Sequence, residues 1–297
     1  MKEHAREVEL SIIIVAHNAR RYLDGCLRSI LQYVSVAYEV VLVDNGSQDG
    51  TCSFVRETFP WVQFIASEKN LGFTAGNNLA VSRSVGKYLL LLNADTVLLT
   101  DIAPAMRLLQ ENLTIGVVGG RMFRSNDQPG ISTGHFPSSS RLWLFRSIWM
   151  KPRRAYQCLP ATRADWVEGA FLMTTSENWR ALGGLDEYYF LCADDMDFCR
   201  ATSNRGLTIV QSAEVRYVHF GGHTVSRMTY LYAGFRHYHK KFSGALERRA
   251  AETVLRLGLF ARMSAFGLWY LVTRNPQAGE KWRSFLEVHR TWAQMNP

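Results

Sequence analysis

Residues 10–18 read LSIIIVAHN and residues 87–95 read KYLLLLNAD, and these two stretches decide the fold class. Each is a short apolar run without regular polar alternation, which is typical of a strand covered on both faces of a sheet. Each run ends in polar residues. Because such strands need helices on both sides, the two stretches predict an α/β fold with a mostly parallel sheet and flanking helices.

The segments around these two strands alternate between helical and strand patterns. Helices are expected over residues 20–33, 51–58 and 74–84, and further strands over residues 39–43 and 62–66. Helices and strands that alternate at these lengths favour parallel pairing of the strands. The first 120 residues therefore predict one sheet rather than separate small domains.

Polar side chains follow three of these strands at the point where each strand ends. They are Ala16-His17-Asn18, Asp44-Asn45-Gly46-Ser47 and Asn93-Ala94-Asp95-Thr96. Ligands of such sheets bind at the carboxyl edge of the strands, so the three ends together predict a site. Asp95 suits a hard divalent cation, Mg²⁺ or Mn²⁺, that also binds ligand phosphates. Asp44 could accept hydrogen bonds from a base or a ribose.

Composition excludes several classes of protein. The 297 residues are 47% hydrophobic and 20% charged, which is ordinary for a globular protein and not for a disordered chain or a coiled coil. No stretch has the roughly 18 uncharged apolar residues of a membrane span. The five cysteines lack a C-x-x-C pair and favour reduced thiols in a cytoplasmic protein. The absence of G-x-G-x-x-G and of a P-loop argues against dinucleotide dehydrogenases and P-loop enzymes.

The second half of the sequence is less regular. Residues 121–164 have no clear periodicity and predict a long loop region, and such regions are commonly functional lids. Order returns near residues 167–174 and at the acidic run Asp194-Asp195-Met196-Asp197. Asp197 and Arg200 are most simply a surface ion pair on one helix. Trp166 and Glu168 are candidates for lining an acceptor site.

Six motifs in a fixed order make the sequence similar to one enzyme family. They are SIIIVAHN, VVLVDNGSQDGT, NLGFTAGNN, LLLLNADT, GAFLM…LGGLDEYYFLCADDMDFCR and VHFGG, over about residues 9–226. The sequence resembles family 2 glycosyltransferases, and among them rhamnosyltransferase-like bacterial members that build cell-surface polysaccharides. The resemblance implies a GT-A-like (Rossmann-like) fold. It also implies inverting transfer of a sugar, with rhamnose expected, from a dTDP- or UDP-linked donor to a glycan or polyprenyl-linked glycan.

The resemblance also assigns residues to the donor site. Asp44 matches the family aspartate that contacts the pyrimidine base, with Ala16, His17 and Asn18 beside it. A loop-and-helix motif near the donor is matched by Asn70, Gly72 and Asn77. Two departures are His17, where the family usually has tyrosine, and Ala94, where it usually has proline.

The metal and the catalytic base are assigned by the same resemblance. Asn93 and Asp95 match the first and last positions of the metal-binding DxD element, with Asp95 the expected ligand. His219 matches a histidine that completes the metal site or touches the diphosphate. Asp194 and Asp195 match the acidic pair that supplies the general base. Asp194 is one methylene shorter than the usual glutamate, so Asp195 is the residue more expected to act as the base. If the two carboxyls are close, each raises the other's proton affinity.

The C-terminal part of the chain is basic and aromatic. We expect a catalytic domain over residues 1–226, with a nucleotide-binding half at 9–120 and an acceptor-binding half at 121–226, and a basic amphipathic helical extension over 227–297. Residues 141–154 carry five positive charges and no acid, and residues 236–262 carry seven positive and two negative charges. With nearby aromatic residues they predict peripheral attachment to an anionic membrane, on its cytoplasmic face. The alternative is a solvated basic helix packed on the catalytic domain.

Three other functions agree less well with the sequence. The sequence has no helix-turn-helix, zinc-finger or RNP-type signature, so no nucleic-acid partner is expected. A sugar-phosphate nucleotidyltransferase would need a glycine-rich loop with arginine after the first strand, and residues 17–20, HNAR, are not such a loop. A catalytically inactive scaffold or sugar-nucleotide sensor is the remaining alternative, and the presence of Asp44, Asp95, Asp195 and His219 argues against it.

Overall fold

The computed structural model describes residues 8–125, 127–143, 161–221 and 227–295. Contacts divide these residues into two compact units. The sheet unit comprises residues 8–125, 127–134, 161–190 and 194–221. The helical unit comprises residues 135–143, 191–193 and 227–295. The domain bounds expected from the sequence remain a prediction.

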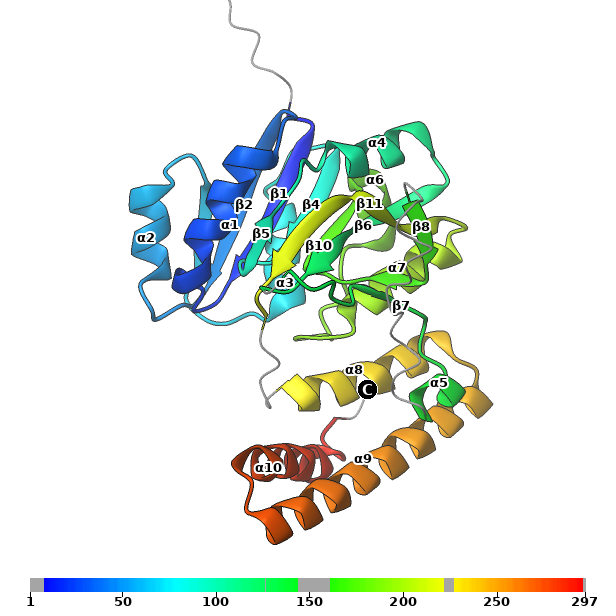
Figure 1. Cartoon of the computed structure of the whole chain (residues 1–297). Helices are drawn as coiled ribbons and strands as arrows, with labels where there is room; N and C mark the ends of the chain where they lie inside the picture. The colour runs from blue at the N-terminus through cyan, green and yellow to red at the C-terminus, as the bar shows by residue number, and fades with distance from the viewer. Residues whose placement is uncertain (1–7, 126, 144–160, 222–226, 296–297) are drawn as a thin grey trace, which may run out of the picture. The chain divides into compact units, whose positions relative to one another are not determined.

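Nine strands of the described residues form the main sheet of the sheet unit (Figure 1). Their order is β3-β2-β1-β4-β10-β6-β11-β5, and β8 also pairs with β11. Pairing is parallel from β3 to β4 and between β6 and β11, whereas β10 runs antiparallel to β4 and β6. The bounds are β1 Leu10–Ala16, β2 Tyr38–Asn45, β3 Gln63–Ser67, β4 Tyr88–Leu92, β5 Thr96–Leu98, β6 Ile115–Phe123, β8 Ala161–Ala164, β10 Phe171–Thr175 and β11 Thr208–His219.

Helices flank this sheet and bury both of its faces. They are α1 Arg20–Tyr33, α2 Thr51–Thr58, α3 Phe73–Val81, α4 Ala103–Glu111, α6 Ser176–Leu182 and α7 Asp194–Asn204. The apolar residues of α1 recur at helical spacing, so Leu23, Leu27 and Ile30 are fully buried in one cluster with alternate residues of β1. Burial raises the pKa of the Cys26 thiol, on the same helix face, to about 12. The α/β class with a mostly parallel sheet and flanking helices is confirmed.

The region expected to be a long loop is partly regular. Strand β6 continues to Phe123, β8 pairs antiparallel with β11, and β7 (Thr133–Gly134) pairs with β9 (Trp166–Val167). A five-residue helix, α5, covers Ser139–Trp143. Elements of two to five residues are too short for periodicity to reveal, so tertiary pairing rather than local pattern forms them. Residues 144–160 lie outside the described residues.

The helical unit contains α5, α8 (Arg227–Phe242), α9 (Ala245–Thr273) and α10 (Pro276–Thr291). The turn between α9 and α10 has clear local causes: Arg274 adopts φ 55°, and the Asn275 side chain accepts hydrogen bonds from the backbone N–H groups of Gln277 and Ala278. Helices α9 and α10 pack through aromatic pairs, including stacked rings of Phe266 and Phe285. In the described part of the chain, no helix has an apolar stretch sufficient to span a bilayer.

Candidate active site

The three polar strand ends predicted from the sequence lie at one edge of the sheet. The parallel register aligns Ala16 of β1 with Asp44 of β2, and β4 runs parallel to β1 on its other side (Figure 1). From β1 the chain adds β2 and β3 on one side, and β4 then pairs with β1 on its other side. Ligands of such sheets bind at this switch in strand order. The sheet therefore gathers the residues that follow β1, β2 and β4 at its carboxyl edge.

Asn45 organises the loops beside Asp44. Its side-chain amide donates to Asn70 Oδ1 and to the Gly72 carbonyl, both at 3.0 Å, and its Oδ1 accepts from the Leu71 N–H at 2.8 Å. Its own carbonyl lies 2.9 Å from His17 Nδ1. The sequence predicts Asn45 only as part of a polar strand end, and the structure adds that its buried amide holds these loops. Asn70 and Gly72 thus shape the loop next to Asp44.

Asp44 has a buried oxygen without a donor. The side chain is 3% exposed, Oδ2 accepts a long hydrogen bond from the Ser47 N–H at 3.4 Å, and Oδ1 has no hydrogen-bond partner among the described residues. A buried acceptor without a donor is costly, so an N–H or O–H group of a bound ligand would stabilise it. This is the arrangement expected of a carboxylate that contacts a base or a ribose.

Asn18 connects the end of β1 to the loop after β2. It adopts φ 52°, its N–H donates to Ser47 Oγ at 2.8 Å, and its Oδ1 accepts from the Gln48 N–H at 2.8 Å. Ala16 is fully buried, whereas His17 and Asn18 are exposed at the edge. His17 and Asn18 therefore have surface available for a ligand next to Asp44.

His219, at the end of β11, lies between two carboxylates. Its Nε2 is 3.3 Å from Asp95 Oδ1, and its Nδ1 is 3.3 Å from Glu168 Oε1. The amide nitrogen of Asn93 is also 3.3 Å from Nε2. Burial alone lowers the pKa of His219, but hydrogen bonds and charge from Asp95 and Glu168 outweigh it and raise the pKa to about 10. The sequence placed Glu168 among acceptor residues, and its contact with His219 was not foreseen.

Asp195 is the second residue of α7 and contacts the backbone that precedes β10. Its Oδ2 accepts from the Gly169 N–H at 3.2 Å, and its Oδ1 accepts from the Met196 N–H at 2.8 Å. Burial, together with the negative charge of Glu168, raises the pKa of Asp195 to about 6. Asp194 is also buried, and the mutual effect expected of the two aspartates stays a prediction.

The backbone before Asp195 is unusual. Cys192 and Ala193 adopt φ 72° and φ 66°, the left-handed region that non-glycine residues rarely occupy. Strain of this kind persists only where the surrounding structure enforces it, and it occurs frequently at functional sites. Here it immediately precedes the first turn of α7, which carries Asp194 and Asp195.

A continuous series of contacts links Asp95 and His219, the candidate metal ligands, to Asp195, the candidate general base. Asp95 contacts His219, His219 contacts Glu168, and the adjacent Gly169 donates to Asp195. The backbone of Asn93 donates to the Ala170 carbonyl, which joins the end of β4 to the start of β10. Residues separated by about a hundred positions in the sequence are thereby held as one group.

Helix α3 holds the segment that precedes α7. Thr74 Oγ1 donates to the Tyr189 carbonyl at 2.6 Å, and Asn78 both donates to and accepts from the backbone of Leu185 at 2.9 Å. Asn77 is buried and donates to the Phe73 carbonyl at 2.8 Å, within its own helix. The motif NLGFTAGNN thus supports both the Asp44 loop and the segment leading to Asp195.

One sequence expectation changes at this point. Asp197 is 5% exposed and accepts from the Tyr189 hydroxyl at 2.8 Å, so its expected surface position is wrong. Its partner lies in the segment before α7, which the helical spacing of Asp197 and Arg200 does not reveal. Trp166 is 1% exposed, and its place in an acceptor site stays a prediction.

Asp95 and His219 fit a divalent cation. The Asp95 carboxylate is the kind of oxygen ligand that Mg²⁺ and Mn²⁺ take, and His219 Nε2, 3.3 Å away, could supply a nitrogen ligand after losing its proton. Within the residues that the structure describes, no group of three or more His, Cys, Asp or Glu side chains forms a metal cage. An ion held by two protein groups would take its other ligands from water and from the phosphates of a bound ligand.

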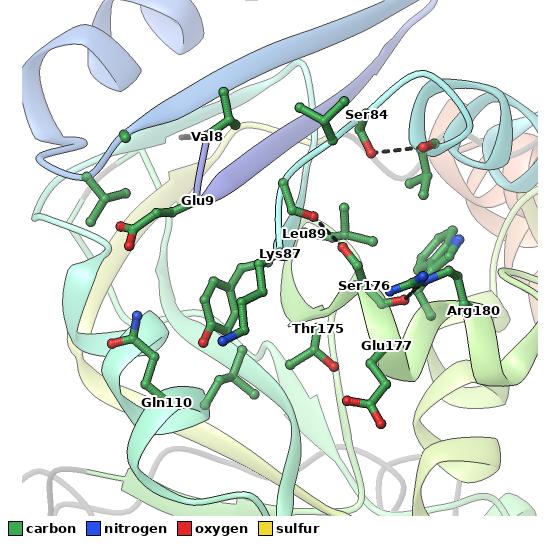
Figure 2. A pocket seen from close by; sticks show the side chains of 18 of the residues that line it. Val8, Glu9, Ser84, Lys87, Leu89, Gln110, Thr175, Ser176, Glu177 and Arg180 are labelled. Atoms are coloured by element: carbon green, nitrogen blue, oxygen red, sulfur yellow. Dashed lines mark hydrogen bonds between the residues drawn. The ribbon is translucent and has the colours of Figure 1, made fainter. Parts of the chain in front are cut away.

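A separate cavity of about 1450 Å³ lies at the opposite edge of the sheet (Figure 2). Its lining includes Glu9 and Lys87 beside the starts of β1 and β4, and Glu177 and Arg180 of α6. None of the site residues predicted from the sequence lines it. The two edges of the sheet are thus chemically distinct.

Relatives of known function carry out sugar transfer. The chain is 22% identical over 215 residues to a low-salt glycan biosynthesis hexosyltransferase of Haloferax volcanii, covering 71% of this chain and 67% of the relative. It is 22% identical over 239 residues to an N-acetylglucosaminyl-diphospho-decaprenol L-rhamnosyltransferase of Mycobacterium tuberculosis, covering 73% and 78%.

Solved structures support the fold. GalNAc-T7 with UDP, GalNAc and Mn²⁺ superimposes with a TM-score of 0.63 at 15% identity, over 80% of this chain and 48% of that one, so the chain spans about half of its length. A mannosyltransferase of Pyrobaculum calidifontis in complex with GDP-Man and Mn²⁺ superimposes with a TM-score of 0.58 at 15% identity, over 97% and 87%. These likenesses confirm the GT-A-like fold.

The sequence itself identifies the family. Residues 11–165 match the family model described as Glycosyl transferase family 2, and this range includes Asp44, Asn93 and Asp95. More than half of the chain is covered, and the fold and the order of the motifs agree with the match. The chain therefore belongs to glycosyl transferase family 2.

Proposed function

We propose that this glycosyltransferase moves a sugar, with rhamnose the first candidate, from a nucleotide diphosphate to a hydroxyl of a glycan or lipid-linked glycan, with inversion at the anomeric carbon. The observation that carries the proposal is the linked group Asp95–His219–Glu168 and Gly169–Asp195, at the same sheet edge as Asp44, whose Oδ1 has no partner among the described residues. The mycobacterial rhamnosyltransferase among the relatives supports rhamnose and a polyprenyl-linked acceptor.

In this proposal the donor's base lies against Asp44. The free Oδ1 would accept a hydrogen bond from the imide N–H of thymine or uracil, which favours dTDP or UDP as the carrier. His17 and Asn18 border this position and are exposed. The Asn70–Gly72 loop, held by Asn45, would cover one side of the nucleotide.

Asp95 and His219 would hold Mg²⁺ or Mn²⁺ together with the donor's diphosphate, with Asn93 beside them. Such an ion offsets the negative charge that develops on the leaving phosphates. Glu168 would act as a positioning residue, because its contact with Nδ1 orients the His219 ring so that Nε2 faces Asp95. Mn²⁺ in the two neighbouring structures supports a divalent ion without choosing between the metals.

Asp195 would be the general base. A carboxylate with a pKa of about 6 is ionised at neutral pH and is still basic enough to take a proton from an acceptor hydroxyl in the transition state. The Gly169 N–H holds one carboxylate oxygen in place. Asp194, buried beside it, would support the turn rather than take the proton.

An acceptor linked to polyprenol would place the reaction at a membrane. We therefore propose that the chain acts in the cytoplasm, at the inner face of the cell membrane, in cell-envelope polysaccharide synthesis. The net charge of +8 supports attraction to an anionic surface. An inactive scaffold or sensor of sugar nucleotides is the second candidate, and its signature would be nucleotide binding without transfer.

Calorimetry with dTDP, UDP and GDP, each with and without Mn²⁺, tests the donor site. Binding of one nucleotide that requires Mn²⁺ and is lost in Asp95→Ala is the expected result, and it would name the base. Binding that ignores both metal and mutation would contradict the role of Asp95. Binding of none of the three would contradict the donor site as a whole. Asp24→Asn, an exposed aspartate paired with Arg28 on α1, is the control and should bind like the wild type.

A further inference from the structure

The helical unit contains a basic groove between α8 and α9. The groove has a volume of about 640 Å³ and is lined by five cationic side chains, one carboxylate and one hydroxyl. We call it the α8–α9 groove; its residues are Arg236, Lys240, Arg248, Arg249, Glu252, Thr253 and Arg256. Its formal charge is therefore +4, half of the net charge of the whole chain.

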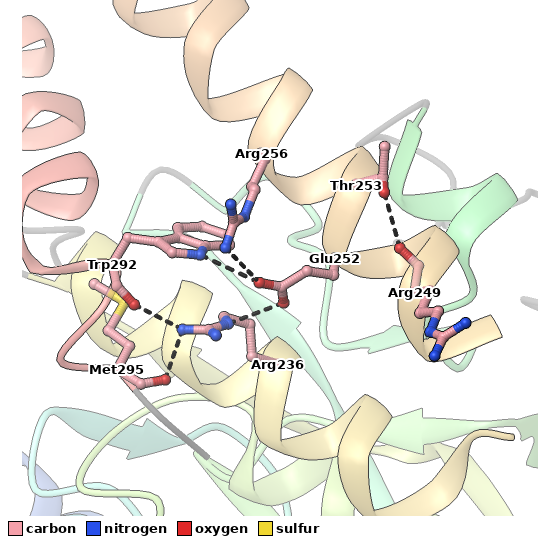
Figure 3. A network of polar contacts seen from close by, with 7 residues as sticks. All are labelled: Arg236, Arg249, Glu252, Thr253, Arg256, Trp292 and Met295. Atoms are coloured by element: carbon pink, nitrogen blue, oxygen red, sulfur yellow. Dashed lines mark hydrogen bonds and ion pairs between the residues drawn. The ribbon is translucent and has the colours of Figure 1, made fainter. Parts of the chain in front are cut away.

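Part of this charge is used inside the unit (Figure 3). Arg236 pairs with Glu252 at 3.0 Å and donates to the carbonyls of Trp292 and Met295 at 2.8 and 2.6 Å. The second oxygen of Glu252 accepts from Arg256 at 3.3 Å and from the Trp292 indole at 3.2 Å. Glu252 is thus fully engaged, and it neutralises only one of the five cations.

Arg248 and Arg249 are the exposed cations at the mouth of the groove. Neither side chain makes an ion pair or a hydrogen bond with another residue that the structure describes, and both are exposed at the start of α9. Like charges held on facing helices repel one another, and a bound anion would relieve this repulsion. Guanidinium groups pair well with phosphate oxygens because they present several donors in one plane.

An apolar stripe runs along α9 next to the groove. Five large apolar residues, the α9 stripe, are 53–74% exposed: Leu257, Phe260, Leu268, Leu271 and Val272. The small residues Ala261 and Ser264 lie exposed between them at helical spacing. The stripe covers about 22 Å of helix. Arg256 precedes Leu257 and lies one turn before Phe260, so the groove and the stripe share a border.

Two aromatic residues of α9 do not belong to the stripe. Phe266 stacks on Phe285, and Tyr270 packs on Trp282, so both belong to the α9–α10 contact. Leu268 and Leu271 remain exposed. Helix α9 therefore carries the groove cations in its N-terminal part and the exposed apolar stripe in its C-terminal part.

We propose that the α9 stripe and the α8–α9 groove together form a docking surface for an anionic lipid bilayer, with lipid phosphates held in the groove. An amphipathic helix that binds a bilayer needs exposed apolar residues and flanking cations, and both are present here. A second copy of the chain fits less well, because a symmetric contact through the stripe would bring two grooves of charge +4 together. The inference rests on the proposed membrane location, which it extends to a specific surface, and on no other part of the proposed function.

Cosedimentation of the full chain with vesicles tests the docking surface, without nucleotide or sugar. We expect binding to phosphatidylglycerol vesicles, weaker binding at high salt, and no binding to phosphatidylcholine vesicles. The double variant Arg248→Gln/Arg249→Gln removes two cations that make no internal contact, and should weaken binding about 30-fold. Leu257→Gln/Leu268→Gln should weaken it by a similar factor, and glutamine preserves helix propensity.

Matched controls lie on the sheet unit. Arg83→Gln/Arg205→Gln removes two exposed arginines, and Leu113→Gln removes a leucine that is 86% exposed. Both controls should bind vesicles within twofold of the wild type. Circular dichroism and the thermal midpoint establish that each variant is folded.

Three results would overturn the proposal. They are wild-type binding to neither kind of vesicle, equal losses in the groove variant and its control, and unchanged vesicle binding in the stripe variant. If sedimentation velocity also showed self-association lost in the stripe variant, a second copy would be the occupant instead. Nucleotide calorimetry on the wild type uses no vesicles, so failure of the donor site and failure of the docking surface are distinguishable.

Discussion

The sheet unit and the helical unit use charged residues in opposite ways. In the sheet unit, Asp95, His219 and Glu168 are partly or largely buried, and each contacts a group of opposite charge at 3.3 Å. In the helical unit, Arg248 and Arg249 are exposed, and the five cations of the α8–α9 groove outnumber its single carboxylate. Buried groups at set distances can select a ligand by geometry, whereas exposed like charges attract a class of partner and are screened by salt.

The largest expected effect lies in the sheet unit. Asp195→Asn removes the proposed base but keeps the shape of the side chain and one oxygen for the Gly169 N–H. Loss of general-base catalysis should lower kcat by about 10²–10⁴-fold, with the donor's Kd within threefold of the wild type. Steady-state kinetics and nucleotide calorimetry measure the two quantities. A kcat within tenfold of the wild type would assign the base to another residue, and Asp24→Asn is again the exposed control.

A smaller effect is expected when the positioning of His219 is disturbed. Glu168→Gln keeps the size of the side chain but removes the charge beside Nδ1. Loss of such a partner to a ligating histidine typically costs about 10–100-fold in metal affinity. Titration of Mn²⁺, followed by its paramagnetic resonance signal, measures this directly and needs no turnover. Glu177→Gln, at the opposite edge of the sheet, should leave Mn²⁺ affinity unchanged.

The pH dependence of transfer should reflect Asp195. Its raised pKa of about 6 means that the carboxyl becomes protonated as the pH falls through 6, and a protonated carboxyl cannot accept the hydroxyl proton. The rate at saturating donor should therefore fall about tenfold per pH unit below 6 and level off above 7. This acid limb should be absent from the residual activity of Asp195→Asn. An acid limb that persists in the variant would point to a different titrating group.

The smallest expected effect concerns the stability of the helical unit alone. Arg236→Met removes the ion pair with Glu252 and leaves two carbonyls without their donor. We expect a loss of about 1–3 kcal/mol in the free energy of unfolding, measured by urea titration, and no change in nucleotide Kd. Arg256→Met breaks a more exposed pair and should cost about 0–1 kcal/mol. A change in nucleotide Kd in either variant would contradict the separation of roles between the units.

Much of the sheet could be predicted because its signals are local. The apolar runs of β1 and β4 and the helical spacing of α1 indicate buried strands and a half-buried helix without reference to any distant residue. Short elements such as β8 and α5 could not be predicted, because partners far along the chain stabilise them. Ser139 of α5, for example, donates from its N–H and its hydroxyl to Glu247 of α9.

By itself, the sequence determined the fold class, the family and the carboxylates that end β2 and β4, because each is encoded in a contiguous stretch. Only the tertiary structure decided what these carboxylates face. It brought Glu168 to His219, buried Asp197 against Tyr189, and left Asp44 with an unpartnered oxygen. It also separated the exposed stripe of α9 from the aromatic residues that pack on α10. Burial and charge pairing depend on segments that are distant in the sequence, and periodicity reports only on near neighbours.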